Sequence, residues 1–383
     1  MKIKSFEFSL RELSGAMGDF GTLFPLSVGY IVVCGMDPAG FLMMMGLANI
    51  ATGLVYRLPL PIEPMKVIAV MAIAQAWPPS MVYAAGFTMG LVWLLFSVLG
   101  VVDWIARHTP ECIVRGIQFS LAALLLMQAL RMAATGWLWG ALALALILVL
   151  RDNRRAPAGL VVMALGVGLA LFRGDLRGLA PPGLRLPPLT GFTLAELRDA
   201  FLGAGLAQIP LTAANAVIAT AALIKTYWPE HPVPERTLAL NQGIMNVITP
   251  FFGGFPLCHG AGGLAGQYAF GARTGGANIL EGGIEVALGL FLSASIAQLF
   301  SVFPQAIIGA MLFYVGVQLL KGVKTLAVNY ELIFVALTVI VSVLNSMALG
   351  FLVGMAAYHG VRACRPCRQR IKERMNEFRS RPD

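Results

Sequence analysis

The chain has 383 residues, of which 58% are hydrophobic and only 12% are charged, and its mean hydropathy is +0.77. A soluble domain carries roughly 25% charged residues, so this composition excludes a soluble protein and predicts an all-α polytopic membrane protein. The net charge of +9 comes mostly from residues 362–381, a pattern typical of the cytoplasmic flank of a membrane span rather than of a nucleic-acid site.

The first half of the chain, 1–172, is expected to form seven apolar elements. Residues 57–64 (R-L-P-L-P-I-E-P) contain three prolines and interrupt the helices there. The element that follows is too short to cross, because a full span needs about 20 residues. The seven elements are 14–34, 38–56, 65–77, 80–102, 113–134, 137–150 and 157–172.

A Pro- and Arg-rich stretch, 173–199, is the expected midpoint and an extracytoplasmic linker, with a surface helix starting at Thr193. The second half, 200–361, is again expected to hold seven elements before a basic cytoplasmic tail, 362–383. These elements are 200–225, 238–254, 260–272, 282–300, 304–320, 328–344 and 346–361.

An internal repeat supports this division. Asn49-Ile-Ala-Thr52 precedes Leu58-Pro-Leu-Pro61 at the spacing at which Asn246-Val-Ile-Thr249 precedes Phe255-Pro-Leu-Cys258. Because each half has an odd number of spans, the halves are inverted relative to each other, and the prediction is about 14 transmembrane elements in a 7+7 inverted repeat. This is the architecture of many secondary transporters.

Charge sets the expected topology. With the N-terminus inside, most basic residues lie in inner segments, which predicts a multi-pass protein of the plasma (inner) membrane with both termini in the cytoplasm. The outer segments hold only Arg131, Arg173, Arg177, Arg185 and Arg198.

Residues 256–276 (P-L-C-H-G-A-G-G-L-A-G-Q-Y-A-F-G-A-R-T-G-G) predict a half-helix that begins inside the membrane. Its first N–H groups lack intrahelical partners and its dipole is positive there, so it is a candidate anion site. A Gly-rich packing seam is the alternative. The repeat aligns residues 63–66 with 260–263, so two half-helices are expected to meet head to head at the midplane.

Ionisable residues at membrane depth are rare and usually functional. Lys66 and Glu63 are three residues apart and can pair on one helix face. Lys66 is expected to face the anion, with Glu63 tuning the site or carrying a proton; alternatively the pair only holds the half-helix start. Asp19 and His259 are further proton-coupling candidates, with a helix cap and a loop histidine as their structural alternatives.

Polar residues on one face of a span mark a substrate path or the bundle interior. Gln208, Thr212 and Asn215 follow i, i+4 and i+7 spacing, and Thr22 occupies the matching place in the first repeat. No catalytic constellation, metal cluster or Walker-type loop is present in the sequence, so neither an enzyme, a metal, a cofactor nor direct ATP coupling is expected. An intramembrane enzyme is disfavoured because no second buried acid is expected beside Asp19.

Four motifs together resemble the molybdate transporter family, a branch of the sulfate permease superfamily. They are Gly18-Asp-Phe-Gly-Thr-Leu-Phe-Pro25, Asn49-Ile-Ala-Thr-Gly53, Pro61-Ile-Glu-Pro-Met-Lys66 and Pro256-Leu-Cys-His-Gly-Ala-Gly-Gly-Leu-Ala-Gly-Gln-Tyr268. The family more often has glutamine where this chain has Glu63.

The resemblance implies uptake of molybdate and the inverted fold, with a core of the first four elements of each half and a gate of the last three. It implies anion contacts by Lys66 and by the backbone of Cys258, His259, Gly260, Ala261, Gly262 and Gly263. The paired half-helices favour a secondary active oxyanion transporter. The sequence leaves open tungstate or sulfate as the substrate, proton coupling, a homodimer and the role of Cys364 and Cys367. A proton-coupled nucleobase carrier of the same fold and an anion channel or sensor are the alternatives.

Overall fold

The computed structural model describes residues 2–3, 5–19, 23, 26–151, 153, 156–322 and 331–363. Thr22, the Cys364–Cys367 pair and the rest of the tail lie outside this part of the chain, as does the side chain of Asp19. In the first half, α3 and α8 span the predicted ranges, whereas the short helix α6 was not predicted. The first-half elements are β1 (Lys2–Ile3), β2 (Phe6–Glu7), α1 (Leu10–Ala16), η1 (Met17–Asp19), η2 (Gly29–Val33), α3 (Pro38–Tyr56), β3 (Ile62–Pro64), α4 (Lys66–Ala74), α5 (Pro79–Val98), α6 (Val101–His108), α7 (Glu111–Ala133), α8 (Trp137–Leu150) and α9 (Ala158–Arg173).

The second half differs from the prediction at two places. The expected surface helix at Thr193 is the first turn of a continuous helical run, 194–227, and α15 begins well before residue 282. The second-half elements are α10 (Leu194–Ala200), η3 (Phe201–Gly205), α11 (Leu206–Leu211), η4 (Thr212–Ala219), α12 (Thr220–Tyr227), α13 (Glu235–Ile248), η5 (Thr249–Phe252), β4 (Leu257–His259), α14 (Ala261–Ala269), α15 (Gly276–Leu292), α16 (Ile296–Ser301), α17 (Gln305–Gly322), α18 (Leu332–Leu344) and α19 (Met347–Ala363).

The long run 194–227 is not a regular α-helix throughout. It contains Pro210 and changes to π-helical turns in η3 and η4. Proline removes a backbone donor from the helix interior, and π-helical turns often occur at functional sites. The turns of η4 carry Thr212 and Asn215, two of the predicted site residues.

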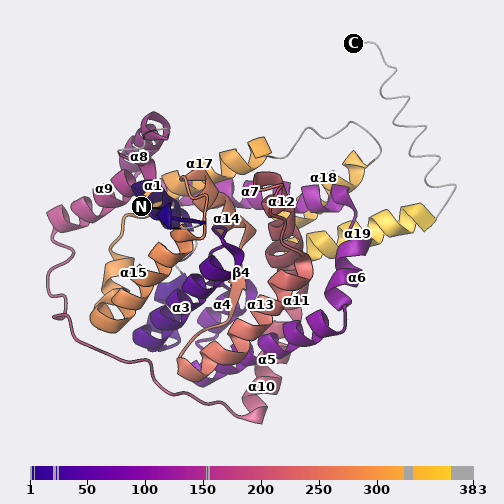
Figure 1. Ribbon diagram of the computed structural model, residues 1–383, viewed down its shortest axis with the longest axis horizontal. Helices are drawn as coiled ribbons and strands as arrows, with labels where there is room; N and C mark the ends of the chain where they lie inside the picture. Colours follow the sequence, from indigo (N-terminus) through magenta and orange to yellow (C-terminus); the bar gives the residue numbers. More distant parts are fainter. Residues whose placement is uncertain are drawn as a thin grey trace.

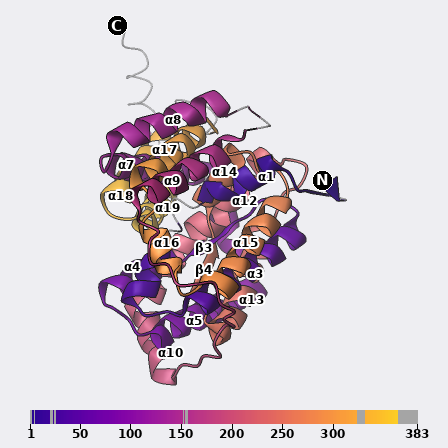
Figure 2. The same cartoon turned by 90° about the vertical axis from the view of Figure 1, so that its left-hand side faces the viewer.

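Four helical segments of the described chain are long and apolar enough to cross a bilayer: α3, α5, α7 and the run from α10 to α12. Shorter apolar helices accompany them, among them α8, α9 and α18. The chain is therefore an integral membrane protein. Its helices form two groups, with α7, α8, α17 and α18 together and α3, α5, α13 and α15 together, and the β3–β4 pair lies deep in the molecule (Figures 1 and 2).

The internal repeat is present in the backbone. A shift of 197 residues carries Pro38, the start of α3, to Glu235, the start of α13. The same shift carries Pro79, the start of α5, to Gly276, the start of α15. The repeats interlock, because α3 packs against α15 and α13 against α5. Gly46 and Gly282 allow the first contact, since a Cβ on either would overlap the carbonyl oxygen of the other.

The alignment of the two repeats that the sequence motifs gave is shifted by two residues at the strands β3 and β4. β3 is antiparallel to β4, with Ile62 opposite His259, Glu63 opposite Cys258 and Pro64 opposite Leu257. The strands follow the preceding helices at different distances, so Ile62 corresponds to Leu257 and Glu63 to Cys258 in the fold. The predicted match of Glu63 with Gly260 is therefore wrong by two positions.

The repeated asparagines hold the strands. Asn49 Oδ1 accepts a hydrogen bond from Ile62 N at 2.9 Å, and Asn246 Oδ1 accepts one from Leu257 N at 2.8 Å. Each side chain thus satisfies the first amide of a strand that has only one strand partner. This explains why the sequence carries asparagine at the same place in both halves.

We predict that Asn246→Ala lowers the thermal unfolding midpoint of the detergent-solubilised protein. The substitution removes bonds to Gln242 O, Leu257 O and Leu257 N and leaves buried groups unpaired, at about 1–3 kcal/mol each. Asn241→Ala is the matched control, because Asn241 Oδ1 on the same helix has no hydrogen-bond partner in the described chain. Equal midpoints for the two variants would contradict the role of the repeated asparagine.

Candidate functional site

The β3–β4 pair places two half-helices in opposite directions. α4 begins immediately after β3 and α14 immediately after β4, and the strands are antiparallel. Met65 N also donates to Pro256 O at 2.9 Å, which extends the link to the start of α4. The positive ends of α4 and α14 therefore lie on either side of one short strand pair.

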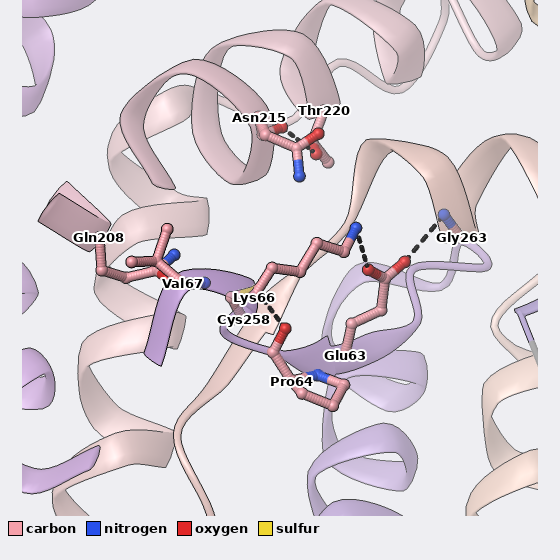
Figure 3. Close-up of polar contacts among 9 residues, drawn as sticks. All are labelled: Glu63, Pro64, Lys66, Val67, Gln208, Asn215, Thr220, Cys258 and Gly263. Carbon is pink, nitrogen blue, oxygen red and sulfur yellow. Dashed lines mark hydrogen bonds and ion pairs between the residues drawn. The ribbon is translucent and has the colours of Figure 1, made fainter. Parts of the chain in front are cut away.

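Glu63 joins these two helix starts (Figure 3). Its side chain is fully buried, and its Oε1 accepts a hydrogen bond from Gly263 N in the first turn of α14 at 2.8 Å. Its Oε2 lies 3.0 Å from Lys66 Nζ, at the first residue of α4. The carboxylate thus has the two partners that an oxyanion would use, a cation and a free amide of a helix N-terminus.

Gly260 makes room for this carboxylate. A Cβ atom at Gly260 would overlap the carboxyl group of Glu63, whereas a Cβ at Gly262 would meet nothing closer than Leu121 Cδ1 at 3.7 Å. Leu121 and Leu125 belong to α7, so Gly262 lies where α14 faces the group formed by α7, α8, α17 and α18. The two glycines therefore have different neighbours, one a charged group and the other an apolar helix.

Gln208 satisfies the free amides at the start of α4. Its Oε1 accepts from Val67 N at 2.8 Å and from Ile68 N at 3.4 Å, and its Nε2 donates to Thr212 Oγ1 at 2.9 Å. Of the helical face predicted from Gln208, Thr212 and Asn215, Gln208 therefore contacts the start of α4, and Thr212 accepts a hydrogen bond from it. Asn215 is buried, and its Oδ1 has no hydrogen-bond partner among the described residues.

The strand pairing separates Cys258 from His259. Cys258 shares a face with Glu63 and donates its thiol to Pro64 O at 3.7 Å. His259 lies on the opposite face, where its fully buried ring meets Tyr56 of α3 edge to face, with 5.8 Å between ring centroids. The side chain of His259 is thus directed toward α3 and away from Glu63.

The structure brings together Glu63, Lys66, Gln208 and the backbone of Gly260 and Gly263. Thr22 and the side chain of Asp19 lie outside the described residues. The expectation that no second buried acid lies beside Asp19 stays a prediction, but two acids are buried on α15, where Glu281 and Glu285 are 1% and 2% exposed. The sequence predicted that this helix starts after Glu281, whereas α15 begins at Gly276. Asn278, Glu281 and Glu285 follow i, i+3 and i+7 spacing and therefore lie on one face of this apolar helix.

Comparison with known proteins decides the family. A family model described as "Molybdate transporter of MFS superfamily" matches residues 11–126 and 200–319. The chain belongs to the molybdate transporter family. It is 29% identical to "Molybdate transporter 1" of Arabidopsis thaliana, over 92% of this chain and 88% of that protein. It is 30% identical to "Molybdate transporter 2" of the same plant, over 91% of this chain and 86% of that protein.

A solved structure confirms the fold. The structure of SLC26A9 superposes with a TM-score of 0.64 and 12% sequence identity, over 94% of this chain and 66% of that one. At this identity the likeness establishes the sulfate permease type of fold alone. The predicted family and type of fold are therefore confirmed, whereas the count of about 14 transmembrane elements stays a prediction, and the family is one of transporters rather than enzymes.

We predict that Gly260→Ala displaces Glu63 and destabilises the protein by about 1–3 kcal/mol, the usual cost of overpacking. Gly262→Ala is the matched control, with an ordinary contact distance at the added methyl group. Thermal unfolding of both variants, of Glu63→Ala and of Gly260→Ala combined with Glu63→Ala measures the effect. Because the overlap disappears with the carboxylate, Gly260→Ala should cost much less in the Glu63→Ala background than in the wild type. Additive losses would contradict the contact between Gly260 and Glu63.

Proposed function

We propose that this chain is a secondary active transporter that takes up a tetrahedral oxyanion by alternating access. The observation that supports this most directly is Glu63, a carboxylate held by Lys66 and the Gly263 amide. Molybdate is the first candidate, because the two Arabidopsis relatives are named molybdate transporters. Tungstate and sulfate have the same charge and shape.

In this mechanism, Glu63 occupies the anion site when no substrate is bound. An incoming dianion takes the Lys66 ammonium and the Gly263 amide, and Glu63 swings away. Gln208 and Asn215 add neutral donors nearby, which hold an anion without binding it as tightly as further cations would. An ionised Glu63 would repel the dianion, whereas a protonated Glu63 is neutral and can leave its ion pair at lower cost.

The membrane potential opposes uptake of a dianion, and a co-transported cation would offset this cost. Moving one elementary charge against 100 mV costs about 2.3 kcal/mol, so a dianion entering a negative interior costs about 4.6 kcal/mol. A proton that binds Glu63 from outside and leaves to the cytoplasm compensates one of the two charges. Glu63, whose carboxylate lies at the proposed anion site, is therefore the proposed proton carrier.

Alternating access needs two bodies that move relative to each other. We assign the core to the first four of the seven predicted elements in each half and the gate to the last three. The gate then contains α7, α8 and α9 of the first half and α17, α18 and α19 of the second. Gly262 of α14 faces Leu121 and Leu125 of α7, at 3.7 and 3.8 Å from an added Cβ. This apolar contact is the place where the gate would close over the anion site.

We predict that Lys66→Ala weakens molybdate binding roughly 10- to 100-fold, because a charge-assisted contact contributes about 1.5–3 kcal/mol. Glu63→Gln should instead strengthen binding about tenfold, since a neutral amide competes less with the dianion. Isothermal titration with molybdate at one fixed pH measures both effects.

Lys225→Ala, which removes an exposed lysine of α12, is the control and should bind like the wild type. Absence of micromolar binding of molybdate, tungstate and sulfate by the wild-type protein would contradict the proposed substrate class. Weaker binding by Glu63→Gln would contradict the role of Glu63 as a competitor of the anion.

A further inference from the structure

Two acidic side chains of α15 are buried inside the membrane domain, one helical turn apart. Glu281 Oε2 accepts a hydrogen bond from Gln267 Nε2 of α14 at 2.6 Å. Glu285 Oε2 accepts one from Asn49 Nδ2 of α3 at 2.8 Å. Glu285 Oε1 is also buried and has no hydrogen-bond partner within the described chain. The mechanism above uses neither carboxylate.

The surroundings of Glu285 supply no compensating cation. Among the described residues Glu285 forms no ion pair, and Glu281 is the acidic neighbour one turn away. The charged or titratable groups on the segments that pack against α15 lie toward its two ends. Near its start, at Gly275 and Gly276, they are Glu7, Arg11, Glu12, Tyr56, Arg57 and Tyr268, and near its end they are Asp37 and Arg185. An ionised carboxylate in such a place is costly, and a bound proton removes the charge.

The fold itself does not require these acids. The repeat shift of 197 residues carries Glu281 back to Ala84 and Glu285 back to Thr88 on α5. Thr88 Oγ1 donates to Ala84 O within its own helix. The equivalent helix pair, α5 with α13, therefore packs without a carboxylate at either of these two positions.

Glu285 is connected to the anion site through Asn49. Asn49 Nδ2 donates to Glu285, and Asn49 Oδ1 accepts from Ile62 N, one residue before Glu63. In the other repeat, Asn246 Nδ2 donates to the carbonyls of Gln242 and Leu257 instead. Glu285 thus fixes the orientation of the amide that positions β3.

We propose that Glu285 binds the second proton transported with each oxyanion. The proposal rests on the proposed function, in which Glu63 carries one proton and leaves one negative charge of the dianion uncompensated. A proton from the outer side adds to a carboxylate oxygen of Glu285 and leaves from it to the cytoplasm. One oxyanion then crosses with two protons, and no net charge moves.

The coupling ratio of the purified protein in liposomes tests this assignment. The ratio is obtained from the equilibrium accumulation of radioactive molybdate at imposed pH gradients and clamped membrane potentials. The wild type should transport two protons per molybdate, with accumulation independent of potential. Glu285→Gln should transport one, so its accumulation falls about 50-fold at 100 mV, negative inside.

Glu281→Gln is the matched comparison, because it removes the neighbouring acid on the same helix and should keep the ratio of two. A ratio of two in Glu285→Gln overturns the proposal. A wild-type ratio of one or less also overturns it, and this measurement stands even if the variant fails to fold. A wild-type protein that neither binds nor accumulates molybdate would instead overturn the proposed function.

Discussion

A buried negative charge must be paired, and in this protein that requirement organises the centre of the molecule. The Glu63 carboxylate takes the Lys66 ammonium and the Gly263 amide, and so joins the starts of the two half-helices. Removing one partner of such a buried pair usually costs about 3–5 kcal/mol. In the proposed mechanism this contact is the resting state of the anion site. A bound dianion replaces the carboxylate there and takes over the Lys66 ammonium and the Gly263 amide.

The repeat provides the frame for this contact. Two asparagines hold the strands, and the crossed packing of α3 with α15 and of α13 with α5 fixes the strand pair between them. The two repeats differ at the positions that carry buried acids. Glu63 lies opposite Cys258 across the strands, and the acids of α15 correspond to Ala84 and Thr88 of α5 in the other repeat. At each of these places one repeat carries the acid and the other carries a neutral residue.

Much of this could be predicted from the sequence. Three prolines in residues 57–64 and the glycines after His259 marked both breaks, and the spacing of Glu63 and Lys66 predicted their pairing. The direction of His259 could not be predicted, because the strand register that turns it toward Tyr56 depends on a partner 200 residues away in the chain. Glu281 was missed because apolar periodicity does not distinguish a helix that begins at Gly276 from one that begins at 282. Glu285 lay inside the predicted element 282–300 but was not singled out as an acid at membrane depth.

The position of the bound oxyanion tests the central claim most directly. Molybdenum scatters X-rays anomalously, so a crystal structure with molybdate would locate the metal without ambiguity. We expect molybdenum between Lys66 Nζ and Gly263 N, with the Glu63 carboxylate moved out of that place. Molybdenum elsewhere, with the hydrogen bond between Glu63 and Gly263 still intact, would contradict it.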